Sequence, residues 1–308
     1  MTKLGLGLAA LGRPEYINIR ENKKIDKSVT AFKKNTFDVL DNAYKNGIRY
    51  FDTAPSYGKG EQFLFEWHEE RKYTDVFFGT KWGYTYVANW ELNYNGKHEI
   101  KEHSLEKLIE QWETSKHLLP NLKYYQIHSA TLDSGVLENE EVCLKLDEIS
   151  RKFDVKIGLS ASGIYQSEIV KRALEIQVKG KQLFDVYQIT YNFLEQSPKE
   201  IIKTLHKQHK IVIIKEALAN GRVLKNDANI LNSLSKKYNV GKDAIAIRFV
   251  IDNVAPNIVL SGAFFKKQLK ANLKANDFKL TTDELFALEK LEKKPKDYWQ
   301  ERSKLDWK

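Results

Sequence analysis

The chain has 308 residues and a formal net charge of +9, from 50 Lys and Arg against 41 Asp and Glu. The single cysteine, Cys143, excludes an intrachain disulfide and a cysteine-rich metal site, and the lack of disulfides fits a reducing, cytoplasmic compartment. The lysines are scattered among glutamates and form no basic stripe or recognised module, so the charge fits solvated helix faces and we expect no nucleic-acid partner.

The predicted elements begin with Leu4–Leu8, a glycine-interrupted apolar run that lacks the cleavage site of a signal peptide and suits a first strand. No later stretch approaches the ~20 continuous apolar residues of a membrane span, so we expect no membrane partner. Seven further β-branched or aromatic runs follow at Ile48–Asp52, Val76–Thr80, Tyr124–His128, Val155–Ser160, Val186–Tyr191, Lys210–Lys215 and Ile258–Ser261.

Stretches of helical period separate these runs, among them Ser104–Leu118 and Ile164–Val178. Alternating strands and helices predict right-handed crossovers and a parallel sheet. Eight such units predict an α/β fold, a closed (β/α)8 TIM barrel that occupies residues 1–308 as a single domain. An open doubly wound sheet is the rival fold, but no Gly-x-Gly-x-x-Gly follows an early strand.

Two connections are unusually long, Arg13–Ser28 after the first strand and Gly83–Lys101 after the third. In a barrel both lie at the C-terminal face, where active sites are assembled. Aromatic side chains crowd the second, so it either lines a substrate mouth or packs on itself; Trp82, Tyr84 and Trp90 are the candidate substrate contacts. The tail from about residue 293 is charged but carries three aromatic residues, so we expect it to dock on the barrel.

Ionisable side chains follow three successive strands of the predicted barrel. Asp52 ends the second strand and Tyr57 lies in the turn after it, Lys81 follows the third strand, and His128 ends the fourth. All these ends converge on one mouth. Tyrosine has an ordinary pKa of about 10, which a lysine ammonium would lower. A carboxylate would orient the lysine and a histidine would hold a carbonyl oxygen, so the group suits proton transfer beside a hydride donor.

Two other chemistries fit the sequence less well. The seven histidines are dispersed without convincing carboxylate partners, so we expect no metal site. A serine hydrolase would need a Gly-x-Ser-x-Gly elbow, which the chain lacks.

The segments Asp52-Thr-Ala-x-x-Tyr57-Gly58, Thr80-Lys81-Trp82-Gly83 and Gln126-Ile127-His128 together resemble the aldo-keto reductase superfamily in order and spacing over essentially the full chain. The resemblance implies a nicotinamide-dependent oxidoreductase whose catalytic tetrad is Asp52, Tyr57, Lys81 and His128. It also implies contacts to the cofactor from Ser160, Gln188, Lys215, Leu218, Ser261, Gly262, Lys266, Gln268 and Asn272.

The cofactor side departs from the family pattern at three positions. Ala161 stands where the family has Asn, with Ser162 as a replacement for the lost amide contact. Lys215 stands where an aromatic residue is usual, and Tyr191 is a candidate substitute for it. Gln268 stands where many relatives have a basic residue for the 2′-phosphate. NADP(H) is still favoured by the resemblance, and NAD(H) remains the alternative.

The resulting prediction is transfer of hydride between the nicotinamide and an aldehyde, a ketone or the C1 carbon of a sugar, with Tyr57 as general acid and base. The wording around Asp52 and Tyr57 is similar to the branch with aldose 1-dehydrogenases and bacterial aldehyde reductases. The alternative is a nicotinamide-binding regulatory or sensor protein of the same fold with little turnover. Nothing in the sequence marks an interface, so a monomer is self-sufficient.

Overall fold

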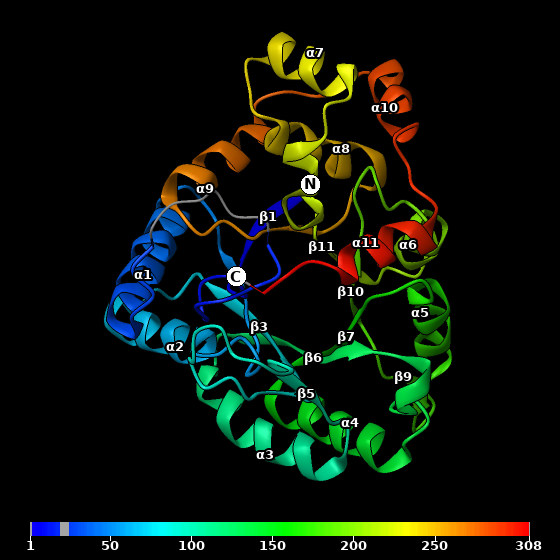
Figure 1. Ribbon diagram of the computed structural model, residues 1–308. Helices are drawn as coiled ribbons and strands as arrows, with labels where there is room; N and C mark the ends of the chain where they lie inside the picture. The colour runs from blue at the N-terminus through cyan, green and yellow to red at the C-terminus, as the bar shows by residue number, and fades with distance from the viewer. Residues whose placement is uncertain (1, 19–24, 308) are drawn as a thin grey trace.

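The computed structural model describes residues 2–18 and 25–307, and in these residues eight parallel strands close into a barrel (Figure 1). Around the barrel the strand order is β1, β12, β11, β10, β7, β6, β3, β2. The strands are β1 (Lys3–Gly7), β2 (Tyr50–Asp52), β3 (Phe77–Trp82), β6 (Leu122–Ala130), β7 (Lys156–Ala161), β10 (Val186–Thr190), β11 (Ile211–Lys215) and β12 (Ile258–Ser261). Every predicted run forms a strand, so the prediction of a single-domain (β/α)8 barrel is confirmed.

Helices surround the barrel, and α7 and α10 lie at its periphery, where both pack on α8 (Figure 1). The helices are α1 (Val29–Lys45), α2 (Gly60–Arg71), α3 (Leu105–Ser115), α4 (Glu140–Phe153), α5 (Gln166–Glu175), α6 (Lys199–Lys207), α7 (Asn229–Tyr238), α8 (Lys242–Val254), α9 (Lys266–Leu273), α10 (Thr282–Glu289) and α11 (Pro295–Ser303). Within the described part of the chain, none of these helices combines the length and apolar character needed to cross a membrane.

The two helical stretches that the sequence predicted differ in outcome. The first is confirmed: Ser104 caps α3 by accepting a hydrogen bond from the Lys107 amide, and a 3-10 turn continues the helix to Leu118. The second is shorter than predicted, because α5 covers only Gln166–Glu175. Val178 instead enters a small hairpin of β8 (Gln177–Val178) and β9 (Lys181–Gln182).

Every second side chain of a strand faces the barrel interior. These inward side chains are apolar at the base of the barrel and polar at its mouth. At the base, an inner cluster of Tyr50, Val186, Ile213 and Ile258 is sealed from solvent. Two residues further along three of these strands, the same inward face carries Asp52, Gln188 and Lys215. The packed base thus supports polar side chains that are all aimed at one opening.

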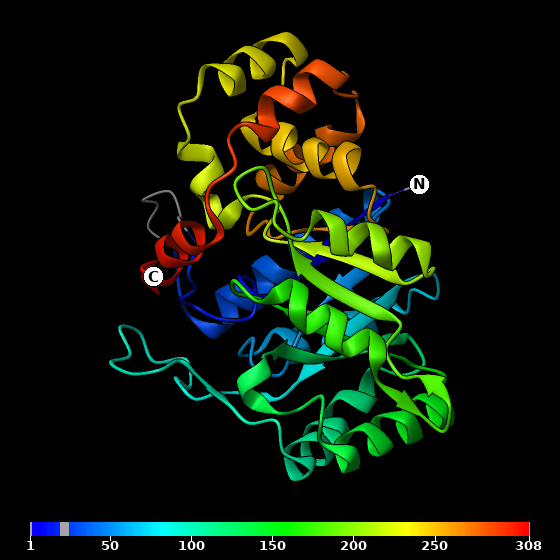
Figure 2. The same ribbon diagram turned by 90° about the vertical axis from the view of Figure 1, so that its right-hand side faces the viewer.

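The mouth is covered by segments from distant parts of the chain. Residues 83–101 form an excursion that begins and ends in the antiparallel pair β4 (Tyr84–Tyr86) and β5 (Glu99–Lys101). Figure 2 shows this excursion and α11 on the same side of the barrel, opposite to the N-terminus. Residues 19–24 of the long connection after β1 lie outside the described residues.

Candidate active site

Asp52 and Lys81 form a buried ion pair at the centre of the mouth. Lys81 Nζ lies 2.5 Å from Asp52 Oδ2 and also donates to the Thr53 carbonyl at 2.9 Å. The Asp52 Oδ1 atom accepts hydrogen bonds from Gln188 Nε2 at 2.8 Å and from the Tyr50 hydroxyl at 3.1 Å. Each charged group therefore has hydrogen-bond partners that offset the free-energy cost of its removal from water.

Gly79 on β3 makes room for this arrangement. A Cβ atom there would lie 2.1 Å from the Tyr50 hydroxyl oxygen, so a larger residue would push the tyrosine away from Asp52.

Tyr57 is held beside this pair by the close packing of two loops. Gly58 has a φ of +63°, and a Cβ there would lie 2.5 Å from the Gly12 carbonyl oxygen. The Lys59 amide donates to that same oxygen at 2.7 Å. As a result the Tyr57 ring lies 4.8 Å from Lys81 Nζ and 5.2 Å from the Arg13 guanidinium.

The expected lowering of the Tyr57 pKa is wrong for this environment. Burial, followed by the charge of Asp52, holds the pKa of Tyr57 well above its usual value, and Arg13 only partly opposes this. Lys81 cannot reverse the effect because Asp52 neutralises it at 2.5 Å. Tyr57 is therefore a neutral phenol near neutral pH.

His128 faces Tyr57 across the mouth, with ring centroids 5.5 Å apart. Burial, reinforced by the charges of Lys81 and Arg13, holds the pKa of His128 well below its usual value, so the ring is neutral. Its Nδ1 lies 3.2 Å from Oγ of Ser56, which is fully buried. When that hydroxyl donates, the proton of the imidazole sits on Nε2, where it can be donated to a carbonyl oxygen. Sequence reasoning missed Ser56, although it directly precedes Tyr57.

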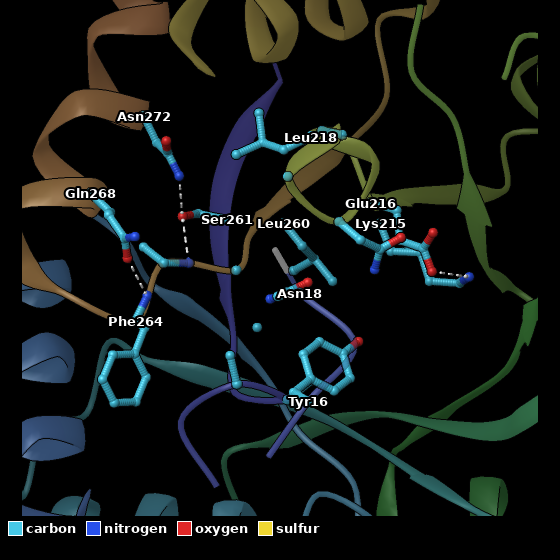
Figure 3. A pocket seen from close by; sticks show the side chains of 18 of the residues that line it. Tyr16, Asn18, Lys215, Glu216, Leu218, Leu260, Ser261, Phe264, Gln268 and Asn272 are labelled. Carbon is cyan, nitrogen blue, oxygen red and sulfur yellow. Dashed lines mark hydrogen bonds and ion pairs between the residues drawn. The ribbon is translucent and has the colours of Figure 1, made fainter. Parts of the chain in front are cut away.

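Two cavities meet at this group of residues. The first is a groove, partly open to solvent, that extends from Gln268 and Asn272 of α9 toward Tyr16 and Lys215 (Figure 3). Tyr57 also lines it. The second lies over Tyr57 and His128, under α11 and the C-terminal segment. The residues that line both cavities are Tyr16, Tyr57, Gln188, Lys215 and Glu216.

The groove is lined by four of the predicted cofactor contacts, which are Gly262 and, at the end labelled in Figure 3, Ser261, Gln268 and Asn272. The Asn272 amide and the Ser261 hydroxyl are 2.8 Å apart. Gln268 Oε1 accepts from the Phe264 and Phe265 amides at 2.9 and 3.0 Å, so this side chain also caps α9.

Lys266 does not line the groove. Its side chain is exposed and its ammonium lies 3.9 Å from Asp38 on α1, so the predicted direct contact is not supported.

The groove is suited to a dinucleotide with negatively charged phosphates. Of the three carboxylates among the described residues that line it, Asp52 is paired with Lys81 and Glu216 with Arg302, which leaves Asp243. Leu218 supplies apolar lining, and α9 has no acidic residue in its first turn.

Lys215 and Glu216 follow each other at the end of β11 and have different partners. Lys215 Nζ donates to the hydroxyls of Ser162 and Thr190 at 2.8 and 2.6 Å. Burial lowers the pKa of Lys215 to about 8, although Glu216 opposes the shift. Glu216 accepts three hydrogen bonds of 2.6 to 3.0 Å from Arg302 on α11.

The Glu216 carboxylate, whose charge would repel a phosphate, is thus neutralised by Arg302, 86 residues further along the chain. Burial opposes its charge, but Arg302 and Lys215 outweigh burial and lower the pKa of Glu216 to about 2.

Tyr191 cannot replace the missing aromatic residue. It is fully buried, stacks on Phe249 of α8 at 6.3 Å, and lines neither cavity. On β10 the side chains of Gln188 and Thr190 face inward, so Tyr191 follows the outward alternation.

Of the three predicted substrate contacts, one lines the second cavity and two do not. Tyr84 lines the second cavity, with its ring 4.8 Å from that of His128. Trp82 does not, because Lys81 points into the barrel and the next residue must face the helices, where Trp82 is fully buried. Trp90 packs on Phe32 at 5.3 Å and donates to the Lys27 carbonyl, so it anchors the loop instead.

Sequence reasoning also missed Arg13, which is almost fully buried in the wall of the second cavity. Arg13 pairs with Glu99 at 2.9 Å, and its guanidinium lies against the rings of Tyr16, Tyr57 and Trp307 at 4.5, 5.2 and 4.7 Å. These aromatic faces offset the cost of burying the cation.

The C-terminal segment covers this wall. Trp307 stacks on His98 at 4.3 Å, and Tyr298 of α11 is buried against Arg222 at 4.0 Å.

Ser160 lines the second cavity, where its hydroxyl accepts from the Ser129 amide at 2.8 Å. Ala161 is buried in β7, while Ser162 reaches Lys215. Across residues 2–18 and 25–307, no three His, Cys, Asp or Glu side chains gather into a group that could hold a metal ion.

A TIM barrel with a Tyr, Lys, Asp and His cluster between two cavities defines a class of oxidoreductases, and comparison with known proteins agrees. The family model described as "Aldo/keto reductase family" matches residues 3–293. The chain therefore belongs to the aldo/keto reductase family of nicotinamide-dependent oxidoreductases.

The chain is 22% identical over 296 residues to YqkF, an uncharacterised oxidoreductase of Bacillus subtilis (strain 168), and the match covers 85% of this chain and 89% of that protein. The fold is similar to the holo form of the aldo-keto reductase AKR11C1 from Bacillus halodurans, with a TM-score of 0.70, 19% identity, and coverage of 94% and 92%. It is also similar to a mutant of Gox0644 in complex with NADPH, with a TM-score of 0.65, 22% identity, and coverage of 94% and 89%.

Proposed function

We propose that this protein transfers hydride between NADP(H) and the carbonyl carbon of an aldehyde, a ketone or a sugar, with Tyr57 as the proton-transfer residue. One observation carries the proposal: Tyr57 stands where a groove suited to a dinucleotide meets a second cavity lined by His128 and Tyr84. The nicotinamide supplies the hydride when it is bound.

Residues at the mouth of the barrel orient the carbonyl group and supply the proton. Neutral His128, protonated at Nε2, donates a hydrogen bond to the carbonyl oxygen and orients it. Tyr57 donates the proton that this oxygen needs as it becomes an alcohol. Because burial and Asp52 raise the pKa of Tyr57, the phenol form dominates near neutral pH and favours reduction, whereas oxidation of an alcohol requires the tyrosinate.

The preference for NADP(H) over NAD(H) is supported by the charge at α9. Lys266, Lys267 and Lys270 give this helix three cations without an acidic residue. Lys266 lies 3.9 Å from Asp38, so of the first two lysines we expect the exposed Lys267 to contribute more to attraction of a 2′-phosphate.

The test is a titration of NADPH and NADH by quenching of the six tryptophans, followed by turnover assays with simple aldehydes and aldoses. We expect tighter binding of NADPH and steady oxidation of it by an aldehyde. Tight binding without turnover would favour the regulatory alternative, and binding of neither cofactor would contradict the proposal. Turnover of aldehydes but not aldoses would exclude the sugar branch.

A further inference from the structure

Lys215 lies at the junction of the two cavities, where its charge would act on the reacting end of a bound cofactor. It is one of the residues that line both the groove and the second cavity, together with Tyr57 and Gln188. Hydride can pass between a molecule in the groove and one in the second cavity only where the two spaces meet. The reacting end of a cofactor must therefore share this junction with the Lys215 side chain.

The charge of Lys215 is less compensated than that of two other cations around the junction. Lys81 pairs with Asp52 at 2.5 Å, and Arg13 pairs with Glu99 at 2.9 Å. Among the residues that the structure describes, the hydrogen-bond acceptors of Lys215 are two neutral hydroxyls. The neighbouring carboxylate, Glu216, lies at 4.0 Å and makes three hydrogen bonds to Arg302.

We propose that Lys215 makes the site discriminate between the two redox forms of the cofactor, because its ammonium disfavours the positively charged oxidised nicotinamide and leaves the neutral reduced ring unaffected. This inference rests on the proposed function. It assigns to the substituted position a part in cofactor selectivity rather than a simple loss of a stacking partner.

The sign of the effect follows from Coulomb's law. Two like charges about 6 Å apart at an effective dielectric constant of about 20 repel enough to change a binding ratio by up to about a hundredfold. Glu216 attenuates this repulsion, so we expect a change of about tenfold. The reduced and oxidised cofactors carry the same phosphates, so the contribution of the phosphates to binding cancels in the ratio of the two dissociation constants.

Protonation of Lys215 should make this ratio depend on pH. The other charged or titratable groups that face Lys215 are Asp52 on β2, Lys81 on β3, His128 on β6, Glu216 beside it and Arg302 on α11. With its pKa near 8, Lys215 is expected to change charge between about pH 6.5 and about pH 9.5.

The experiment measures dissociation constants of NADPH and NADP⁺ by tryptophan quenching at about pH 6.5 and about pH 9.5. The variants are Lys215→Met, which removes the charge, and Lys215→Arg, which keeps it. We expect the preference for NADPH over NADP⁺ to fall about tenfold from the lower to the higher pH in the unmodified protein. In Lys215→Met the preference for NADPH should not change with pH and should equal that of the unmodified protein at the higher pH. In Lys215→Arg the preference should remain, at both pH values, as strong as that of the unmodified protein at the lower pH.

An equal ratio in the unmodified protein and Lys215→Met at the lower pH would overturn the inference while leaving the proposed function intact. The inference also fails if Lys215→Met instead raises KM only for carboxylate-bearing aldehydes, since Lys215 would then hold the substrate. Failure of the unmodified protein to bind either form would contradict the proposed function itself. The pH series on the unmodified protein remains decisive even if the methionine variant does not fold.

Discussion

The two halves of the barrel mouth are held together in different ways. In the half formed by β2, β3 and β6, Lys81 and His128 are held by Thr53 and Ser56, which belong to the same sequence motif as Asp52 and Tyr57, although 28 and 72 residues separate the partners. In the half formed by β10, β11 and β12, Glu216 depends on Arg302 of α11, which lies outside every motif of the sequence. The first half could therefore be predicted from local motifs, whereas the second could not.

The largest effect is expected from Tyr57→Phe, which removes the proposed proton donor. If the first half carries the proton transfer, loss of the hydroxyl should reduce turnover by about 10² to 10⁴-fold, the range for a positioned acid or base. Cofactor binding should be nearly unchanged, because the groove and the second half stay intact. Steady-state assays and fluorescence titrations measure the two effects, and an equal loss of both would show that Tyr57 serves binding instead.

The second test removes the ion pair that anchors the first half. Lys81→Met leaves Asp52 as an uncompensated buried carboxylate and should lower the free energy of unfolding by about 3 to 5 kcal/mol. The double variant Lys81→Met, Asp52→Asn should recover much of that loss. Urea unfolding measures both; a double variant as unstable as the single would mean that packing of the lysine stem, not its charge, is what matters.

The third test concerns the ion pair between Arg302 of α11 and Glu216 directly after β11, here called the clasp. Glu216 has a pKa of about 2 in the folded protein, below its ordinary 4.5, so its contribution to stability is present above about pH 4.5 and is lost as pH falls toward 2. Arg302→Met should cost about 2 kcal/mol at neutral pH and flatten the slope in this window. Urea unfolding over a pH series checks this, with Glu216→Gln as the matched variant that should show an equally flat slope. A slope identical to that of the unmodified protein would exclude the clasp as its origin.

The smallest expected effect belongs to Ser56→Ala. Without the donor to Nδ1, His128 loses its preference for the Nε2-protonated form, and we expect turnover to fall about tenfold at unchanged cofactor affinity. Nitrogen NMR of the imidazole should show the shift between tautomers, and Ser56→Thr should restore both signals. An unchanged imidazole spectrum in the alanine variant would remove Ser56 from this role.

The alternation of side chains along strands explains most of what could be predicted and some of what was wrong. Since Lys81 faces the barrel interior, Trp82 must face the helices, and the same rule turns Tyr191 away from the mouth. Both errors were avoidable from sequence. The partner of Glu216 could not be predicted, because Arg302 reaches it only through the placement of α11, which no local pattern specifies.

Hydride transfer by this protein can be observed directly with an isotope label. The protein is incubated with an aldehyde and NADPH that carries deuterium at the transferred position of the nicotinamide, and the alcohol is analysed by mass spectrometry. We expect deuterium on the former carbonyl carbon with the unmodified protein and almost none with Tyr57→Phe at equal cofactor occupancy. An alcohol without deuterium, or no alcohol from a protein that binds NADPH tightly, would contradict it.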